Sequence, residues 1–139
     1  MSRLFACLLL AAAASSPAAD AQTVTLHSGG RNVRIVAGDA AVLPADFPAD
    51  VTLPQPYTLV QVERIGRVVT LEADTPGDVA TVAAQWDARM EADGWRDAKV
   101  VPPPTGQAMA WVKPGRAAIA WVKPAAAGVR FQLQLRSSD

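Results

Sequence analysis

The clearest helix in the chain is encoded by residues 75–95, TPGDVATVAAQWDARMEADGW. Thr75 is predicted as its N-cap, Pro76 as its first residue and Asp78 as the acidic partner of a capping box, because these residue types suit the unpaired amides of a helix start. An apolar stripe at helical spacing predicts the side that faces a core. It consists of Val79, Val82, Ala83, Trp86 and Met90.

Gly94 is predicted to end this helix. Glycine adopts the left-handed backbone conformation without strain, so it suits the C′ position of a Schellman motif. Trp95 is then the C″ residue and Met90 the C3 residue, two positions whose side chains contact each other in this motif. The helix end is therefore expected to be anchored on the core.

Runs typical of β-strands lie on both sides of the helix. Residues 58–65 and 67–73 precede it, with Gly66 between them, and three runs follow it, at 108–113, 116–123 and 129–136. The last run alternates apolar and polar residues, which predicts one buried and one solvated face. The order β-β-α-β-β-β predicts an α+β fold, a two-layer sandwich in which an antiparallel sheet of about five strands carries one helix on one face.

Two segments precede this α+β domain, which spans residues 57–136. Residues 22–43 form an N-terminal arm with two alternating runs, predicted as a β-hairpin. Residues 44–56 form a connector with four prolines, which disfavour both helix and central strand. The connector is expected to pack across the surface of the domain through three apolar residues, Phe47, Val51 and Leu53.

Residues 1–21 have the pattern of a secretory signal peptide, with Arg3 as the positive start and residues 4–14 as the apolar region. About 11 apolar residues are too few for a bilayer span, which needs roughly 20. Ala19 and Ala21 are the small residues that precede cleavage. We therefore expect an exported protein, periplasmic or extracellular, whose mature chain begins at Gln22 and has no transmembrane span.

The amino-acid composition disfavours some classes of function. The chain has 13 basic and 13 acidic residues, and removal of the predicted signal takes away one of each, Arg3 and Asp20. A balanced chain shows no electrostatic footprint for nucleic acid. The single cysteine, Cys7, lies in the predicted signal, so the mature chain is expected to lack disulfides and thiol chemistry.

Residues that could carry catalysis are few and scattered. His27 is the only histidine, whereas triads and zinc sites need further partners. Glu63 and Glu72 lie in neighbouring predicted strands, on the polar side of each. The aspartates near the prolines, at positions 39, 46 and 50, lack the spacing of a calcium loop. We expect no enzyme, no metal and no cofactor.

The two strand tryptophans, Trp111 and Trp121, are placed by hairpin register. A turn at Pro114 and Gly115 pairs Val112 with Ala117. If residues 124–128 form the next turn and Lys123 pairs with Val129, Trp121 lies opposite Phe131 in the core and Trp111 on the open face. An exposed tryptophan can anchor a partner, and the alternative is that the arm or the connector folds over it. The predicted partner surface consists of Met109, Trp111, Lys113 and Arg116.

A resemblance covers roughly residues 44–136. The segment Asp46-Phe47-Pro48-Ala49-Asp50-Val51-Thr52-Leu53-Pro54 resembles the D-F-P-x-D-V-x-L-P signature of small exported bacterial α+β proteins. Those proteins continue with two strands, a helix ending in Gly-Trp, here Gly94-Trp95, and a Lys-x-Gly-Arg hairpin, here residues 113–116. Many of them are lipoproteins, but this chain has no cysteine at its predicted cleavage site. The architecture is also similar to helix-grip domains, such as those in a lipoprotein component of the outer-membrane barrel assembly machine. The resemblance implies fold and compartment and no catalytic residue.

Three functions are compatible with these observations. The leading one is a non-enzymatic envelope or periplasmic domain that binds a protein or another envelope component through its sheet. The second is a carrier of a lipid or small apolar ligand in a groove between helix and sheet. The third is a hydrolase, which the absence of a recognisable nucleophile–base pair disfavours. A carrier needs an apolar cavity of several hundred Å³, on the order of other ligand pockets, whereas a binding domain needs a filled core and an exposed apolar patch.

Overall fold

The computed structural model describes residues 22–28 and 31–138. The predicted signal peptide, with its cleavage site, lies outside the described residues. The elements follow one another in this order: β1 (Gln22–Ser28), β2 (Arg31–Ala37), the 3₁₀ helix η1 (Gly38–Ala40), β3 (Thr58–Ile65), β4 (Val68–Thr75), α1 (Val79–Ala92), β5 (Arg96–Ala98), β6 (Gln107–Lys113), β7 (Arg116–Ala125) and β8 (Gly128–Ser137).

The strands form one antiparallel sheet in the order β1-β2-β3-β4-β8-β7-β6-β5. The α+β class is confirmed, but the sheet has eight strands instead of about five. The five expected strands form its middle. The arm hairpin joins at one edge, because β2 pairs with β3, and the short β5 joins at the other through β6. The arm is therefore a continuation of the sheet.

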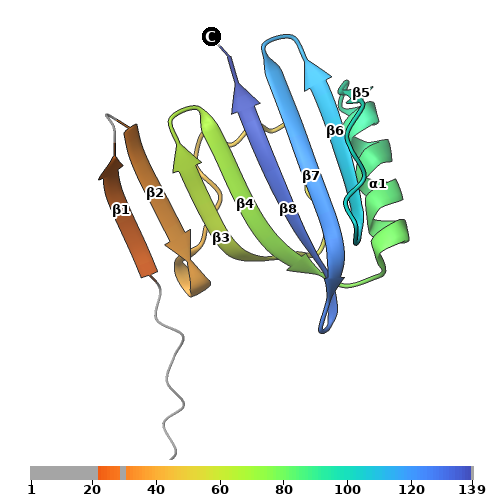
Figure 1. The fold of residues 1–139 in the computed structure, drawn as a ribbon, viewed down its shortest axis with the longest axis horizontal. Coiled ribbons are helices and arrows are strands. Elements are labelled where there is room, and N and C mark those ends of the chain that lie inside the picture. The colour runs from red at the N-terminus through yellow and green to blue at the C-terminus, as the bar shows by residue number, and fades with distance from the viewer. Residues whose placement is uncertain (1–21, 29–30, 139) are drawn as a thin grey trace, which may run out of the picture.

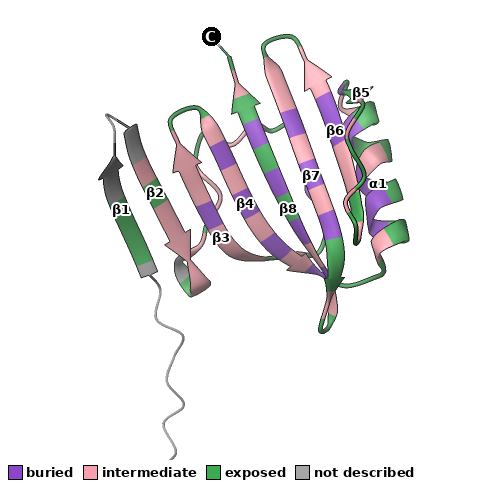
Figure 2. Cartoon of the chain, in the orientation of Figure 1, coloured by how far each residue is buried: buried purple, intermediate pink, exposed green. Residues whose placement is uncertain are grey.

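The sheet has one covered and one open face (Figure 1). Helix α1 packs behind β6 and β7, and the connector crosses the same face behind the middle strands. Among the described residues, no element covers the opposite face, which we call the open face. Figure 2 shows the consequence along β8, where buried and exposed residues alternate. The buried ones, as expected, are Val129, Phe131, Leu133 and Leu135.

The connector packs on the covered face as predicted. Val51 and Leu53 are buried, and Phe47 packs against the same core. The predicted helix stripe is also confirmed, since Val82, Ala83, Trp86 and Met90 are buried and Val79 packs partly buried against the core. Helix, connector and sheet thus share one apolar interior.

The predicted start of the helix is wrong by one turn. Thr75 is the last residue of β4, where its buried hydroxyl donates a hydrogen bond to the carbonyl of Pro56 at 2.6 Å. Pro76 and Gly77 form the connection, and Asp78 is the N-cap, accepting from the amide of Thr81 at 2.9 Å. Thr75 therefore pairs with Val129 of β8 as a strand residue, although the sequence alone predicts it as the N-cap of the helix.

The predicted end of the helix is confirmed. Gly94 has a φ of 84°, in the left-handed region. Its amide donates to the carbonyl of Glu91, and the amide of Trp95 donates to the carbonyl of Met90 at 3.0 Å. These are the two hydrogen bonds of a Schellman motif. Met90 and Trp95 lie in the same buried cluster.

One hairpin register is confirmed and the other is wrong. The turn at Pro114 and Gly115 pairs Val112 with Ala117, as predicted. The turn before β8 is tighter than expected, because Ala125 pairs with Gly128 and Lys123 with Arg130. A shift of one residue moves every side chain of a strand to the other face. Consequently Val122, and not Trp121, lies opposite Phe131 in the core.

Candidate functional site

The residues of the predicted partner surface lie on the covered face. Trp111 is fully buried, with its indole N–H donating to Asp87 of α1 at 2.7 Å. Met109 is partly buried against the core. The expectation that Trp111 is exposed on the open face is therefore wrong, and the physical reason is the tighter turn before β8. Helix α1, rather than the arm or the connector, covers this tryptophan.

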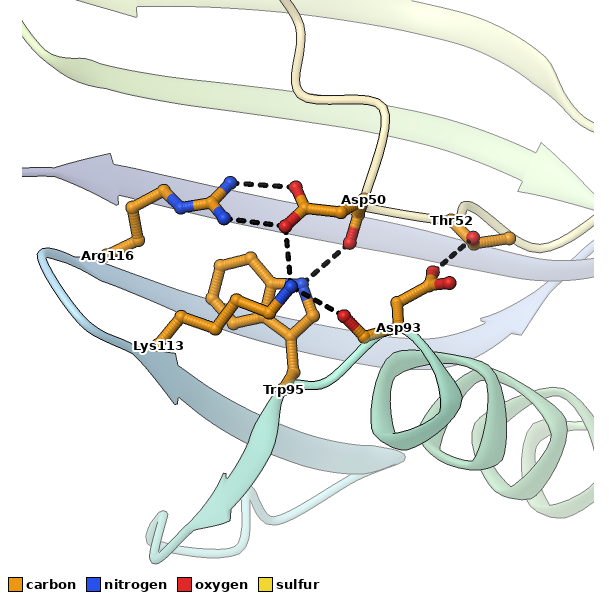
Figure 3. A network of polar contacts seen from close by, with 6 residues as sticks. All are labelled: Asp50, Thr52, Asp93, Trp95, Lys113 and Arg116. Atoms are coloured by element: carbon orange, nitrogen blue, oxygen red, sulfur yellow. Dashed lines mark hydrogen bonds and ion pairs between the residues drawn. The ribbon is translucent and has the colours of Figure 1, made fainter.

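Lys113 and Arg116, the other two predicted residues, belong to a polar network that fastens the connector to the sheet (Figure 3). Arg116 binds both carboxylate oxygens of Asp50, at 2.7 and 2.6 Å. Lys113 donates to the same carboxylate at 2.6 Å and also to the main-chain carbonyl of Asp93. One connector carboxylate is thus held by two cations, one at the end of β6 and one at the start of β7.

Trp95 lies beneath these cations. Its ring centroid is 5.3 Å from Lys113 Nζ and 5.1 Å from Arg116 Cζ, distances typical of cation–π contacts. Its indole N–H donates to the main-chain carbonyl of Asp50 at 2.7 Å. The helix end closes the network, since Thr52 of the connector donates to the carboxylate of Asp93 at 2.6 Å. We call these six residues the clasp: Asp50, Thr52, Asp93, Trp95, Lys113 and Arg116.

The electrostatics of the clasp favour a structural role. Hydrogen bonding to Arg116, joined by Lys113, holds the pKa of Asp50 far below its ordinary value of 3.8, although burial opposes this shift. A carboxylate that stays charged and has both oxygens occupied is a poor general base. The clasp therefore binds three chain segments together, with the Asp50 carboxylate held in its charged form.

Three sequence segments that lie far apart in the chain meet in the clasp. Asp50 and Thr52 come from the D-F-P-x-D-V-x-L-P segment, Trp95 from the Gly-Trp helix end, and Lys113 and Arg116 from the Lys-x-Gly-Arg hairpin. The sequence analysis weighed Asp50 as a calcium ligand and did not predict this pairing. The available signal was charge: an acidic residue in one motif and two basic residues in another.

The open face carries an apolar patch around Trp121, a residue that the sequence analysis predicts in the core. Trp121 lies between Gln132 of β8 and Ala108 of β6 and is half-buried. Around it, β6 and β7 present small or aliphatic side chains. We call this set the tryptophan patch, in which every member is partly exposed except the buried Ala110: Ala108, Ala110, Val112, Ala117, Ile119 and Trp121.

A polar band borders the tryptophan patch on the open face. Gln132 and Gln134 of β8 are exposed. Next to them, Arg130 binds Asp74 of β4 through two hydrogen bonds of 2.7 and 2.8 Å, with Glu72 at 3.7 Å. Hydrogen bonding to Arg130 lowers the pKa of Asp74. The patch is thus apolar in its centre and rimmed by hydrogen-bonding groups, the pattern of many protein interfaces.

The space between helix and sheet is filled by aromatic rings. The ring centroid of Trp86 lies 5.6 Å from that of Trp111 and 5.0 Å from that of Phe131, and all three residues are fully buried. A cavity of about 40 Å³ borders Trp86 where the connector meets α1. A lipid or drug-sized ligand needs several hundred Å³, on the order of other ligand pockets. Larger depressions, such as one of about 280 Å³ beside Lys113 and Arg116, are open to solvent.

The remaining candidate residues for chemistry are two strand glutamates and the histidine of the arm. Glu63 and Glu72 lie on the open face but pair with Thr70 and Gln61 respectively. The side chain of His27 lies outside the described part of the structure. Among residues 22–28 and 31–138, no group of three or more His, Cys, Asp or Glu side chains could hold a metal ion. In the same residues, no helix is long and apolar enough to cross a membrane.

Comparisons with protein-family models, with curated proteins and with solved structures gave no match to this chain.

Proposed function

We propose that this chain is an exported, non-enzymatic domain of the bacterial cell envelope that binds a protein or another envelope component through the open face of its sheet. The tryptophan patch is the observation that carries the proposal. It places a large amphipathic side chain, Trp121, at the surface of a rigid sheet, and tryptophan is enriched among the residues that dominate binding energy at interfaces.

The packing of the covered face supports binding at the surface over carriage in the interior. Trp86, Trp111 and Phe131 occupy the space that a carrier would keep open for its ligand. The clasp holds the connector across the same face. The open face is the side of the sheet that needs no rearrangement to meet a partner.

Site-specific crosslinking in cells tests the proposal. A photoreactive phenylalanine analogue at position 121 keeps an aromatic ring in the tryptophan patch, and the same analogue at Arg89, exposed on α1, is the matched control. We expect a crosslinked product from position 121 and none from position 89. The attached molecule is then identified by mass spectrometry.

A second variant separates binding from folding. Ile119→Lys places a charge in the tryptophan patch at a position outside the buried core. We expect it to remove the crosslink from position 121 while the thermal midpoint stays within a few degrees of the unsubstituted chain, roughly the effect of a surface substitution. A product that forms at position 89, or that persists in Ile119→Lys, would contradict binding through the open face.

A further inference from the structure

The two edges of the sheet are built differently. The β5 edge is three residues long, carries the charges of Arg96 and Asp97, and is followed by three prolines at 102–104. Short length, charge and proline are the devices by which proteins prevent edge strands from pairing with other chains. This edge is protected.

The β1 edge has none of these devices. Its seven residues, QTVTLHS, include no proline and no Asp, Glu, Lys or Arg. Its pairing with β2 runs from Gln22 to Ser28 without a register shift, so no bulge bends it away. Its outer side therefore presents a row of backbone N–H and C=O groups that no other described strand pairs with.

Exposed apolar surface accompanies this unpaired edge. Val24 has an exposed fraction of 42%, and its register places it in one row with Ile35, Glu63 and Thr70 on the open face. The described residues of β1 and β2 contribute no member to the buried core. The arm hairpin is thus attached to the domain mainly by the backbone pairing of β2 with β3, and a further strand beside β1 would stabilise it.

We propose that β1 pairs with β1 of a second copy of this chain, in antiparallel orientation, to form a twofold dimer with one continuous sheet. A twofold axis perpendicular to the sheet brings identical edges together and keeps both open faces on the same side. Val24 of each copy then lies near its equivalent, which buries apolar surface on both.

The absence of charge on β1 favours a second copy of the chain as its pairing partner. The β1 strand contains no Asp, Glu, Lys or Arg, so an oppositely charged partner segment has no charge on it to recognise. When two β1 strands pair, no like charges of these residue types lie opposite each other. The formal net charge of the chain is zero, so two copies approach without long-range repulsion. The dimer is independent of what binds the tryptophan patch, and its failure would leave the proposed function untouched.

Sedimentation equilibrium over a range of protein concentrations tests the dimer. The informative variant is Val24→Lys, because it places like charges beside each other across the twofold axis. The matched control is Val101→Lys, which adds the same charge at a valine with an exposed fraction of 85%. We expect the unsubstituted chain and Val101→Lys to dimerise alike, and Val24→Lys to raise the dissociation constant roughly twofold to fivefold, because like charges opposite each other destabilise strand pairing.

Hydrogen exchange locates the interface independently. Amides of β1 should exchange more slowly as the concentration rises through the dimerisation range, and amides of β5 should not change. A chain that stays monomeric at all concentrations overturns the proposal. So does a dimer that Val24→Lys leaves intact or that Val101→Lys weakens equally, and so does protection confined to the tryptophan patch, which would indicate face-to-face association.

Discussion

Trp111 and Trp121 lie ten residues apart on the two strands of one hairpin, but on opposite faces of the sheet. Trp111 is fully buried against Trp86 and hydrogen-bonded to Asp87, whereas Trp121 is half-buried on the open face. The same residue type therefore has a packing role in one position and is available for contact in the other. The free energy of unfolding of variants at the two positions measures this difference.

We predict that Trp111→Ala lowers the free energy of unfolding by about 3–5 kcal/mol, the usual cost of emptying a buried aromatic site. Trp121→Ala should cost about 1–2 kcal/mol, because part of its surface already contacts water. Urea denaturation of both variants gives the comparison. If Trp121→Ala is the more destabilising change, the register of β7 against β8 is different from the one described.

Two connector aspartates four residues apart provide a second comparison. Asp50 is bound by Arg116 and Lys113 inside the clasp, with exposed side-chain fractions between 16% and 33% for the three partners. Asp46 binds Arg64 at 2.7 Å, but its side chain is 70% exposed. Ion pairs in water contribute little, whereas a partly buried charge that loses its partner is costly.

We expect Asp50→Asn to destabilise the chain by about 1–3 kcal/mol, because it leaves two cations without their shared carboxylate. Asp46→Asn should cost about 1 kcal/mol or less. Chemical denaturation at neutral pH measures both. Equal effects of the two substitutions would mean that the clasp contributes no more than an exposed ion pair.

Among the elements, the turns explain why one hairpin was predictable and the other was not. Pro114 and Gly115 form a strong turn signal, and the β6–β7 register follows from it. Between β7 and β8 the chain reads Pro124-Ala125-Ala126-Ala127-Gly128, and Gly128 suggested the end of a loop. In the structure Gly128 belongs to β8, and a Cβ there would lie 2.4 Å from the carbonyl oxygen of Thr75. Close packing, which sequence does not display, requires this glycine.

Gly106, directly before β6, shows the same requirement, and Gly66 gives a matched control. Both have positive φ, 81° and 58°, but a Cβ on Gly106 would lie 2.1 Å from the carbonyl oxygen of Val122, whereas Gly66 has open space around it. We predict that Gly66→Ala costs about 1 kcal/mol from backbone strain and Gly106→Ala about 2–4 kcal/mol from strain and overlap together.

Thermal denaturation of the two glycine variants checks this ordering. The expected result is a clearly lower midpoint for Gly106→Ala than for Gly66→Ala. Similar midpoints would show that the β6–β7 pairing relaxes around the added methyl group, and that the close approach of Gly106 to Val122 is not needed for the fold.

For the whole molecule, local patterns predicted most elements but not how they associate. The helix stripe, the Schellman motif at Gly94 and the alternation along β8 are written in neighbouring residues, so the sequence alone was sufficient for them. The docking of β2 on β3 and the binding of Asp50 by Arg116 join residues far apart in the chain. Such contacts depend on register and side-chain packing. An error of one residue in one predicted hairpin register placed the predicted site on the wrong face of the sheet.

The clasp also makes the stability of the whole molecule depend on pH in a defined direction. Arg116 and Lys113 lower the pKa of Asp50 in the folded chain below the ordinary value of 3.8. A carboxyl with a depressed folded-state pKa stabilises the fold at every pH above its unfolded pKa. That contribution is lost as the pH falls from the unfolded value towards the folded one, because the unfolded chain then binds the proton first.

We therefore predict that the difference in free energy of unfolding between the unsubstituted chain and Asp50→Asn is constant from pH 7 to about 5 and shrinks below about pH 4. Urea denaturation of both proteins at several pH values between 7 and 2 measures it, and the contributions of all other groups cancel in the difference. The exposed pair supplies the control, since Asp46→Asn should show a small difference throughout. A difference for Asp50→Asn that stays constant to pH 2 would mean that the charge of Asp50 does not stabilise the fold and that the connector is held by its apolar contacts alone.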